Sequence, residues 1–406
     1  MCFVTVPHPL GMISKEEVNA KVDAAFDDIV KAATAWTPSK EKQDAQVKPY
    51  PAKRFKFSGT YADVNDMFQK RKWSLSLPIV PPTVDKVAAM LKGTKRNPAE
   101  VLWVVPPRQG MLTVELVAAL GVMAGAKPEH MPLLIATVEA MADPVAAWRG
   151  PTTTTAATVP VFFISGPIIE KLKLNPGTGT AGGENPVTNA LGYFVNLVGD
   201  VVGGSVPPNF DKSTHGSSAD LVAMVFTENA KENPWKTTYA EEAGFKPGDS
   251  IVTHFSAYLG NANIDHDSKT GQRLLTTLST GLLGSASGLA SCLADYDATY
   301  AINNKVSFAF IVLCPEHAAT IAKDFPDQRA ARDFMRETAA MPYKFYSQET
   351  CVPGKDFGPY DENTFIPRFK KTKSIKFFVS GGPGKQSQIW VPFPQVFKPV
   401  SKKIAE

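Results

Sequence analysis

The chain has 406 residues, of which 44% are hydrophobic, and its formal net charge is +4. This length allows one large or two ordinary domains with a sizeable buried core. The Lys-rich stretches at 48–56 and 368–376 contain no nucleic-acid-binding motif, so we expect a solvated surface and no nucleic-acid partner. The most apolar helix-like stretch, 187–203, is interrupted by Asn and Asp and is too polar to cross a membrane.

The cysteines are few and far apart in the sequence. None of them forms a C-x-x-C pair, which argues against a disulfide framework and against a cysteine-based zinc site. The N-terminus has no basic segment followed by a long apolar one, so no secretory signal is evident. We therefore expect a cytoplasmic protein with unbridged thiols at Cys2, Cys292, Cys314 and Cys351.

The first part of the chain, residues 1–95, is predicted to be a helical arm followed by a Pro-rich segment. Apolar residues at helical spacing predict a helix over 15–33, which could serve as a docking arm or an oligomer contact. Two short helices are expected between 61 and 90, on either side of a run whose prolines exclude a regular helix.

From about residue 96 onward, predicted strands alternate with predicted helices. This alternation is typical of a layered α/β fold with a largely parallel or mixed sheet and helices on both faces, in one domain or two lobes. The expected strands are 102–105, 159–164, 221–226, 251–255, 307–313, 375–379 and 388–391. The expected helices are 114–124, 133–141, 189–201, 274–292, 316–323 and 328–339.

The most informative run is 308–317. Its apolar part predicts a central strand covered on both faces, and the strand stops at Cys314-Pro315 just before Glu316, His317 and a helix. Open α/β sheets present their chemistry at such strand ends, so Glu316 and His317 are candidate acid–base residues. A similar outline is expected upstream, where the strand at 101–105 leads to Thr113 and Glu115, two candidate ligand-binding residues.

Further polar residues fall at other strand ends and in loops. Glu228 and Asn229 follow a predicted strand, Trp235 could form an aromatic wall, and His215 lies in a loop. His266 stands between two aspartates on a predicted loop, a combination that suits a divalent metal or acid–base catalysis but also suits an ordinary surface turn.

Because strand ends on one edge of a sheet converge, we predict that Glu316 and His317 share a pocket with at least one of Glu228, His266 and Thr113.

Two features leave alternatives open. The loop 380–385 exposes backbone N–H groups at Gly381, Gly382 and Gly384 that could cradle an anion, but it matches no phosphate-binding motif and could equally be a tight hairpin turn. Cys314 precedes a helix, which lowers a thiol pKa and suits a nucleophile, although a buried inert thiol fits the same position.

An ordered set of short runs resembles a widespread, mostly bacterial family associated with the UGSC selenoprotein-type domain. The runs are Leu77-Pro-Ile-Val-Pro-Pro-Thr83, 105–107 with Gly110 and 113–115, 122–125 with 127–129, Gly166-Pro167, Glu228-Asn229, Pro234-Trp235, 315–318 and 381–384. The resemblance covers residues 50–395 and implies a related fold and site candidates rather than a defined reaction.

This chain departs from the family pattern in several places. It lacks the Sec/Cys-Gly-Ser-Cys motif of the redox module, and it has Leu120 and Ala126 where relatives carry Asn and Cys. Its run Trp73-Ser-Leu-Ser76 also replaces the Trp-Thr-Asp-Gly of the family. Any redox module must therefore be separate from this chain or absent.

Three functions compete at this point. The first is an enzyme of the lyase or hydrolase type that acts on a small polar substrate through carboxylate and imidazole groups, with a divalent metal as one candidate cofactor. The second is a ligand-binding subunit without chemistry of its own. The third is a redox subunit that works with a separate thiol or selenol protein. We favour the enzyme and expect a homo-oligomer without a membrane partner.

Overall fold

The computed structural model describes residues 4, 6–7, 13–35, 50–207, 214–258, 260–284, 308–346, 361–393, 396 and 398–405. The chain divides into a small compact unit, residues 1–48, and a large one, residues 49–406. The small unit contains helix α1 (Lys15–Thr34), which agrees with the helix predicted at 15–33. Ser14 and Glu17 form a reciprocal capping box at its first turn, which fixes where the helix begins.

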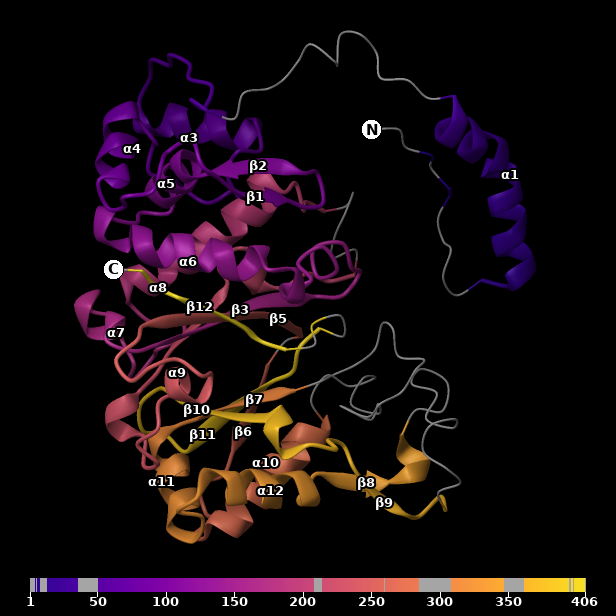
Figure 1. Cartoon of the computed structure of the whole chain (residues 1–406), viewed down its shortest axis with the longest axis vertical. Helices are drawn as coiled ribbons and strands as arrows, with labels where there is room; N and C mark the ends of the chain where they lie inside the picture. The colour runs from indigo at the N-terminus through magenta and orange to yellow at the C-terminus, as the bar shows by residue number, and fades with distance from the viewer. Residues whose placement is uncertain are drawn as a thin grey trace. The chain divides into compact units, whose positions relative to one another are not determined.

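The large unit is a helix–sheet–sheet–helix sandwich (Figure 1). The first sheet has the strand order β12-β5-β3-β4, and the second has the order β10-β7-β11-β6. The bounds of these strands are β3 (Thr158–Ser165), β4 (Met224–Thr227), β5 (Ile251–Tyr258), β6 (Asn261–Ile264), β7 (Ala309–Leu313), β10 (Ile375–Val379), β11 (Gln386–Trp390) and β12 (Val400–Lys403).

The inner faces of the two sheets share one aromatic core. Phe163 of the first sheet stacks on Phe310 of the second with ring centroids 4.4 Å apart, and its ring also meets Phe378 at 4.9 Å. Because each sheet buries one face against the other, strands β3 and β7 are buried along their whole length; β7 is entirely apolar, and β3 is apolar between Thr158 and Ser165 at its two ends.

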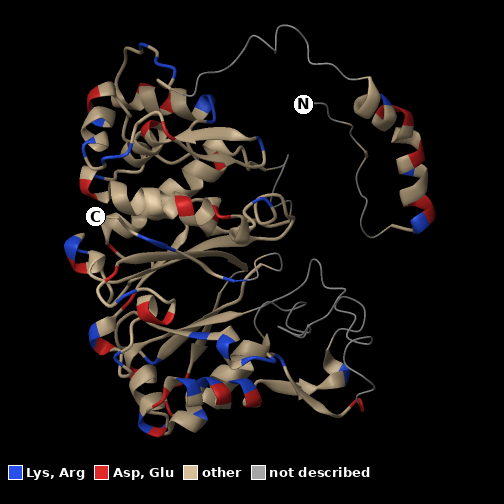
Figure 2. Cartoon of the chain, viewed as in Figure 1, with Lys and Arg blue, Asp and Glu red and all other residues tan. Residues whose placement is uncertain are grey.

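Helices cover the outer face of each sheet. Outside the first sheet lie α5 (Val114–Met123), α6 (Met131–Ala142) and α8 (Pro186–Asn196), which continues as a π-helical segment, Leu197–Val202. Outside the second lie α10 (Gly271–Gly284), α11 (Pro315–Asp324) and α12 (Gln328–Thr338). In Figure 2 the charged residues gather on helices and loops, and the paired sheets carry few of them.

Smaller elements complete the large unit. Helices α3 (Tyr61–Lys70) and α4 (Val84–Leu91) join the first outer core through Phe68 and Met90, so this Pro-rich segment packs with the α/β body. The other short elements are β1 (Val101–Val105), β2 (Gly110–Thr113), α7 (Ile168–Lys171), α9 (Tyr239–Glu242), β8 (Ala340–Pro342) and β9 (Phe365–Pro367). The 3-10 turns are Pro128–His130, Pro144–Ala146, Ser218–Asp220, Ala230–Glu232, Tyr343–Phe345 and Thr372–Ser374.

The prediction of an α/β fold with mixed sheets and flanking helices is confirmed. The predicted central strand is also confirmed, since β7 lies between β10 and β11 with all of its residues buried. The layering differs in one respect, because each sheet has helices on one face and the other sheet on its second face. Within the described residues, no helix has both the length and the apolar composition needed for a membrane crossing.

The strand predicted at 102–105 and the helix predicted at 114–124 are present as β1 and α5, and a second strand, β2, lies between them. The chain first turns back at Pro106-Pro107 and Gln109 (φ +62°) and forms the antiparallel hairpin β1–β2, and α5 starts only after Thr113. Proline at these positions lacks the N–H that a continuing ladder would use, which favours the turn.

The large unit repeats one topology. Each half has a strand, helices, a parallel strand and an antiparallel strand: β3, α7, α8, β4 and β5 in the first half, and β7, α11, α12, β10 and β11 in the second. The halves also exchange strands, since β6 follows β5 but pairs with β11, and β12 follows β11 but pairs with β5. This repeat makes the ends of β3 and β7 equivalent positions.

Candidate functional site

The two halves meet where β4 and β10 end. The backbone N–H of Asn229 donates to the Val379 carbonyl at 2.8 Å, and its side-chain amide donates to the Gly381 carbonyl at 3.1 Å. The Ser380 hydroxyl donates to the Thr227 carbonyl at 2.7 Å. The carboxyl ends of strands from both sheets therefore converge on one edge, which is where α/β folds place their chemistry.

A buried polar cluster lies at the end of β7. His317, in the first turn of α11, is 2% exposed, and Cys314, the residue before that helix, is 5% exposed. The Nδ1 atom of His317 is 2.8 Å from the Ser387 Oγ atom of β11, and its Nε2 atom is 3.1 Å from the Asp265 carbonyl oxygen. The Cys314 backbone N–H donates to the Ser387 hydroxyl at 3.4 Å.

These contacts assign the protons of His317. A carbonyl oxygen can only accept, so Nε2 carries a hydrogen and donates it to Asp265. In the neutral ring, Nδ1 is then the basic nitrogen and accepts from the Ser387 hydroxyl. The cluster is a directed chain of hydrogen bonds with its basic end facing Ser387.

The thiol and the imidazole also affect each other's ionisation. Burial is the largest influence on the Cys314 thiol and raises its pKa, but His317 and the Gln386 backbone together outweigh it, so the pKa lies below the ordinary value. Burial is also the largest influence on His317 and lowers its pKa, but Cys314 and Asp265 together outweigh it, so the pKa is raised. Both shifts favour a thiolate beside an imidazolium.

Glu316 fastens the glycine loop beside this cluster. Its Oε2 atom accepts from the backbone N–H of Gly384 at 2.6 Å and from that of Lys385 at 2.9 Å. These two bonds hold the pKa of the Glu316 carboxyl below its ordinary value. Gly384 has φ +151°, a conformation that side chains rarely adopt, so glycine is required there. The loop at 381–385 forms the β10–β11 connection; the amides of Gly384 and Lys385 are occupied by Glu316, and that of Gly381 donates to the Pro176 carbonyl at 2.8 Å.

The segment around His266 is a structured turn. The Asp265 carboxylate accepts from the hydroxyls of Ser268 at 2.7 Å and Thr277 at 2.6 Å. Burial opposes ionisation, but these bonds bring the pKa of Asp265 down to about 2. His266 is exposed, and its carbonyl accepts from the Lys385 ammonium at 2.8 Å. Within the described ranges, no three His, Cys, Asp or Glu residues are grouped so that they could hold a metal ion.

Glu228 follows β4 in the first half and contacts the end of β3, which is the position equivalent to the end of β7. It is 3% exposed, and its carboxylate accepts from the Tyr239 backbone N–H at 2.6 Å and from the Ser165 hydroxyl at the end of β3. Burial raises its pKa, and the bonds from Ser165 and Tyr239 oppose that rise only in part. This carboxyl therefore holds a proton more readily than an exposed one.

The remaining predicted residues lie elsewhere. Thr113 caps α5 through the Leu116 N–H, and the Glu115 carboxylate accepts from the Ala52 N–H at 2.7 Å in the outer helical layer. Trp235 donates to the Phe325 carbonyl at 3.0 Å and packs on the outer core of the second half. Two further candidates have no part in the cluster: His215 is exposed in its loop, and Gly382 packs closely against Thr178.

The structure thus brings Glu316, His317, Cys314 and the backbone of His266 together. Glu228 bonds within its own half, and a pocket shared between the two stays a prediction. Cys314 is a free buried thiol, as expected, whereas the other three cysteines lie outside the described residues.

Sequence reasoning missed Ser387, Asp265 as a carbonyl acceptor, and Ser165. The first two offer no local pattern. Ser165 did carry a signal, since proline follows closely after both strand ends, at Pro167 and at Pro315.

Comparisons with known proteins bring no further assignment. No protein-family model matches the chain, and no curated protein matches it significantly. The resemblance to the UGSC-associated family stays a prediction that rests on the ordered runs alone.

Proposed function

We propose that this protein is an enzyme of the lyase or hydrolase type that acts on a small polar substrate, with His317 as the group that takes up and returns a proton. The observation that carries the proposal is the fixed tautomer of His317, whose Nε2 donates to the Asp265 carbonyl while Nδ1 faces the Ser387 hydroxyl at 2.8 Å. A general base needs this fixed orientation and hydrogen-bond reach.

The neighbours of His317 supply the other roles. Cys314 precedes the ten-residue helix α11, so a thiolate there benefits from the positive end of the helix dipole. The Ser387 hydroxyl connects the Cys314 backbone to Nδ1. In this proposal, Nδ1 accepts a proton from the thiol or from the substrate and gives it to the leaving group. The buried Glu228 carboxyl, which follows β4 and accepts from Ser165 at the end of β3, is the proposed second acid.

Because Cys314 and His317 are buried, a substrate can reach them only if a neighbouring loop moves. Glu316 ties Gly384 and Lys385 to α11, and Lys385 in turn contacts the His266 carbonyl of the neighbouring turn. Release of the two Glu316 bonds would free the loop next to His317 and admit a small substrate. When the two Glu316 bonds form again, the closed loop would exclude water from the cluster during the reaction.

The test is to incubate the purified protein with each member of a panel of small polar esters, amides and hydroxy acids. Consumption of each compound is measured by mass spectrometry. A substrate consumed by the wild type should be consumed roughly 100-fold to 10,000-fold more slowly by His317→Gln, the usual range for loss of an acid–base group. His215→Gln, which changes an exposed loop histidine, is the matched control. Turnover that survives in His317→Gln, or that is lost equally in the control, would contradict the proposal.

A further inference from the structure

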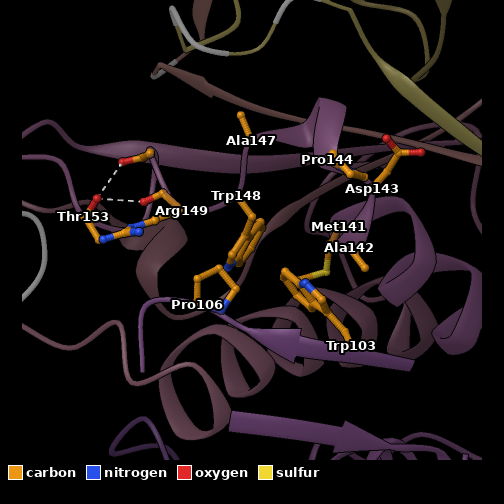
Figure 3. A pocket seen from close by; sticks show the side chains of 11 residues that line it. Trp103, Pro106, Met141, Ala142, Asp143, Pro144, Ala147, Trp148, Arg149 and Thr153 are labelled. Carbon is orange, nitrogen blue, oxygen red and sulfur yellow. Dashed lines mark hydrogen bonds between the residues drawn. The ribbon is translucent and has the colours of Figure 1, made fainter. Parts of the chain in front are cut away.

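A cavity of about 420 Å³ lies between the β1–β2 hairpin and the segment that follows α6 (Figure 3). Its apolar walls are Trp103, Pro106, Met141 and Trp148. The indole rings of Trp103 and Trp148 meet edge to face, with centroids 5.8 Å apart and an interplanar angle of 74°. Its size and its aromatic lining are typical of a small-molecule site.

The charges around this cavity favour an anion. Arg149 lines the cavity and is exposed, and no hydrogen bond or ion pair of its guanidinium is recorded with any residue that the structure describes. The other charged lining residue, Asp143, is already neutralised, because its carboxylate bonds to Lys402 at 2.8 Å and caps the Val145 N–H at 3.0 Å. Lys398 adds a further positive charge near Asp143. The Arg149 guanidinium is therefore the charged group of this cavity that can bind a ligand.

A second donor lies in the wall. Trp148 is 5% exposed, and its Nε1 atom has no hydrogen-bond partner among the described residues. Behind Trp148, a smaller cavity of about 10 Å³ is lined by Ser256, whose hydroxyl is likewise unpartnered within the described chain. That volume is about the size of one water molecule. A buried N–H without an acceptor is costly, so a water in the smaller cavity that links this N–H to a ligand oxygen would be stabilised here.

The loop that carries both donors is held in place. The Thr152 hydroxyl donates to the Trp148 carbonyl at 2.9 Å, and the Thr153 hydroxyl donates to the Arg149 carbonyl at 2.8 Å (Figure 3 shows the latter). The Ser205 hydroxyl fixes the loop from below by donating to the Thr152 carbonyl at 2.9 Å. A site fixed in this way loses little conformational entropy when a ligand binds.

We infer that this cavity binds a small aromatic carboxylic acid. The ring lies against Trp103, Met141 and Trp148, the carboxylate bonds to the Arg149 guanidinium, and one water links the carboxylate to the Trp148 indole N–H. Arginine suits a carboxylate because its planar fork matches the two oxygens. The inference does not depend on the proposed reaction, because the two sites lie at opposite ends of β3. The smaller cavity is lined by Thr158 at the beginning of β3, whereas Ser165 of the proposed site lies at the end of β3.

The probe compounds are phenylacetate, benzyl alcohol, benzylamine and acetate, titrated into the full-length protein with tryptophan fluorescence and calorimetry as readouts. Phenylacetate should bind and change the fluorescence, and it should bind at least tenfold more tightly than each of the other three. Benzyl alcohol or benzylamine binding as tightly as phenylacetate would overturn the inference about charge. Absence of any phenylacetate binding would overturn the site itself.

Variants locate the contact. Arg149→Gln should weaken phenylacetate binding by about fivefold or more, because it removes a charge-assisted hydrogen bond. Trp148→Phe keeps an aromatic wall but removes the N–H, and it should weaken binding by about threefold or more. The matched control is Arg71→Gln, which removes an exposed guanidinium stacked on Trp73, 4.8 Å from its ring centroid. Equal losses in Arg149→Gln and Arg71→Gln, or no loss in Arg149→Gln, would overturn the assignment.

Discussion

At the scale of single residues, the two glutamates of the edge show how surroundings decide chemistry. The Glu316 carboxylate accepts two backbone N–H groups and its pKa is lowered, so it stays charged and serves as a fastener. Glu228 is buried and its pKa is raised, so it can hold a proton. Two carboxyls whose surroundings move their pKa values in opposite directions are suited to different roles.

Three neighbours control the protonation of His317. The Asp265 carbonyl accepts the hydrogen on Nε2, the Ser387 hydroxyl faces Nδ1, and Cys314 in its thiolate form raises the pKa of the ring. An imidazole held in this way keeps one tautomer and an increased basicity despite its burial. The pair with Cys314 is therefore the residue-scale feature on which the proposed chemistry depends.

At the scale of elements, the β10–β11 loop should be held shut by Glu316. In Glu316→Ala, amide hydrogen exchange at Gly384 and Lys385 should rise about tenfold at neutral pH, since each loses a charge-assisted acceptor. Exchange measured by NMR or mass spectrometry checks this. Glu232→Ala, which changes an exposed glutamate in a different loop, is the control.

The two hydrogen bonds of Glu316 should also depend on pH in a defined way. Because the folded pKa of Glu316 lies below the ordinary 4.5, its contribution is fully present above 4.5 and is lost as the pH falls through the lower folded value. Loop protection in the wild type should therefore approach that of Glu316→Ala only in strong acid. Unchanged exchange in Glu316→Ala at neutral pH would show that the loop is held by other contacts.

At the scale of the whole molecule, the elements that could be predicted from the sequence are those whose signal is local. The central strand β7 was predictable because an apolar run marks a strand buried on both faces. Strands β6 and β12 were not predicted, because they are short and partly polar, and each finds its partner in the opposite half. The exchange of these strands depends on pairing across the molecule, which no local pattern reports.

The residues of the candidate site also fall into those that a local sequence pattern reveals and those that it does not. Cys314, Glu316 and His317 were predictable because they follow a strand directly. Ser387 was not, because a serine inside a short strand resembles any other until the strand order brings it to His317. The prediction of an anion-binding loop also could not foresee that Glu316 occupies the amides of Gly384 and Lys385.

The shared aromatic core predicts that the two halves of the large unit unfold together. Phe163→Ala removes a ring that stacks on Phe310 and also meets Phe226 and Phe255, so the free energy of unfolding should fall by about 3–5 kcal/mol. Urea denaturation followed by circular dichroism and fluorescence should show one shared transition at a lower midpoint. Phe57→Ala, at a residue 46% exposed, should change stability by less than about 0.5 kcal/mol. Two separate transitions, or equal losses in both variants, would contradict a common core.

We propose that Cys314 and His317 act as one coupled acid–base pair, and a titration of the Cys314 thiolate measures this coupling. The ultraviolet absorbance of the thiolate is followed with pH, and the difference between wild type and Cys314→Ser isolates this thiol, even though it is buried. The wild-type midpoint should lie below the ordinary thiol pKa of 9.0, and it should rise in His317→Gln, where the partner is lost. A midpoint at or above 9.0 that does not move in His317→Gln would contradict the account.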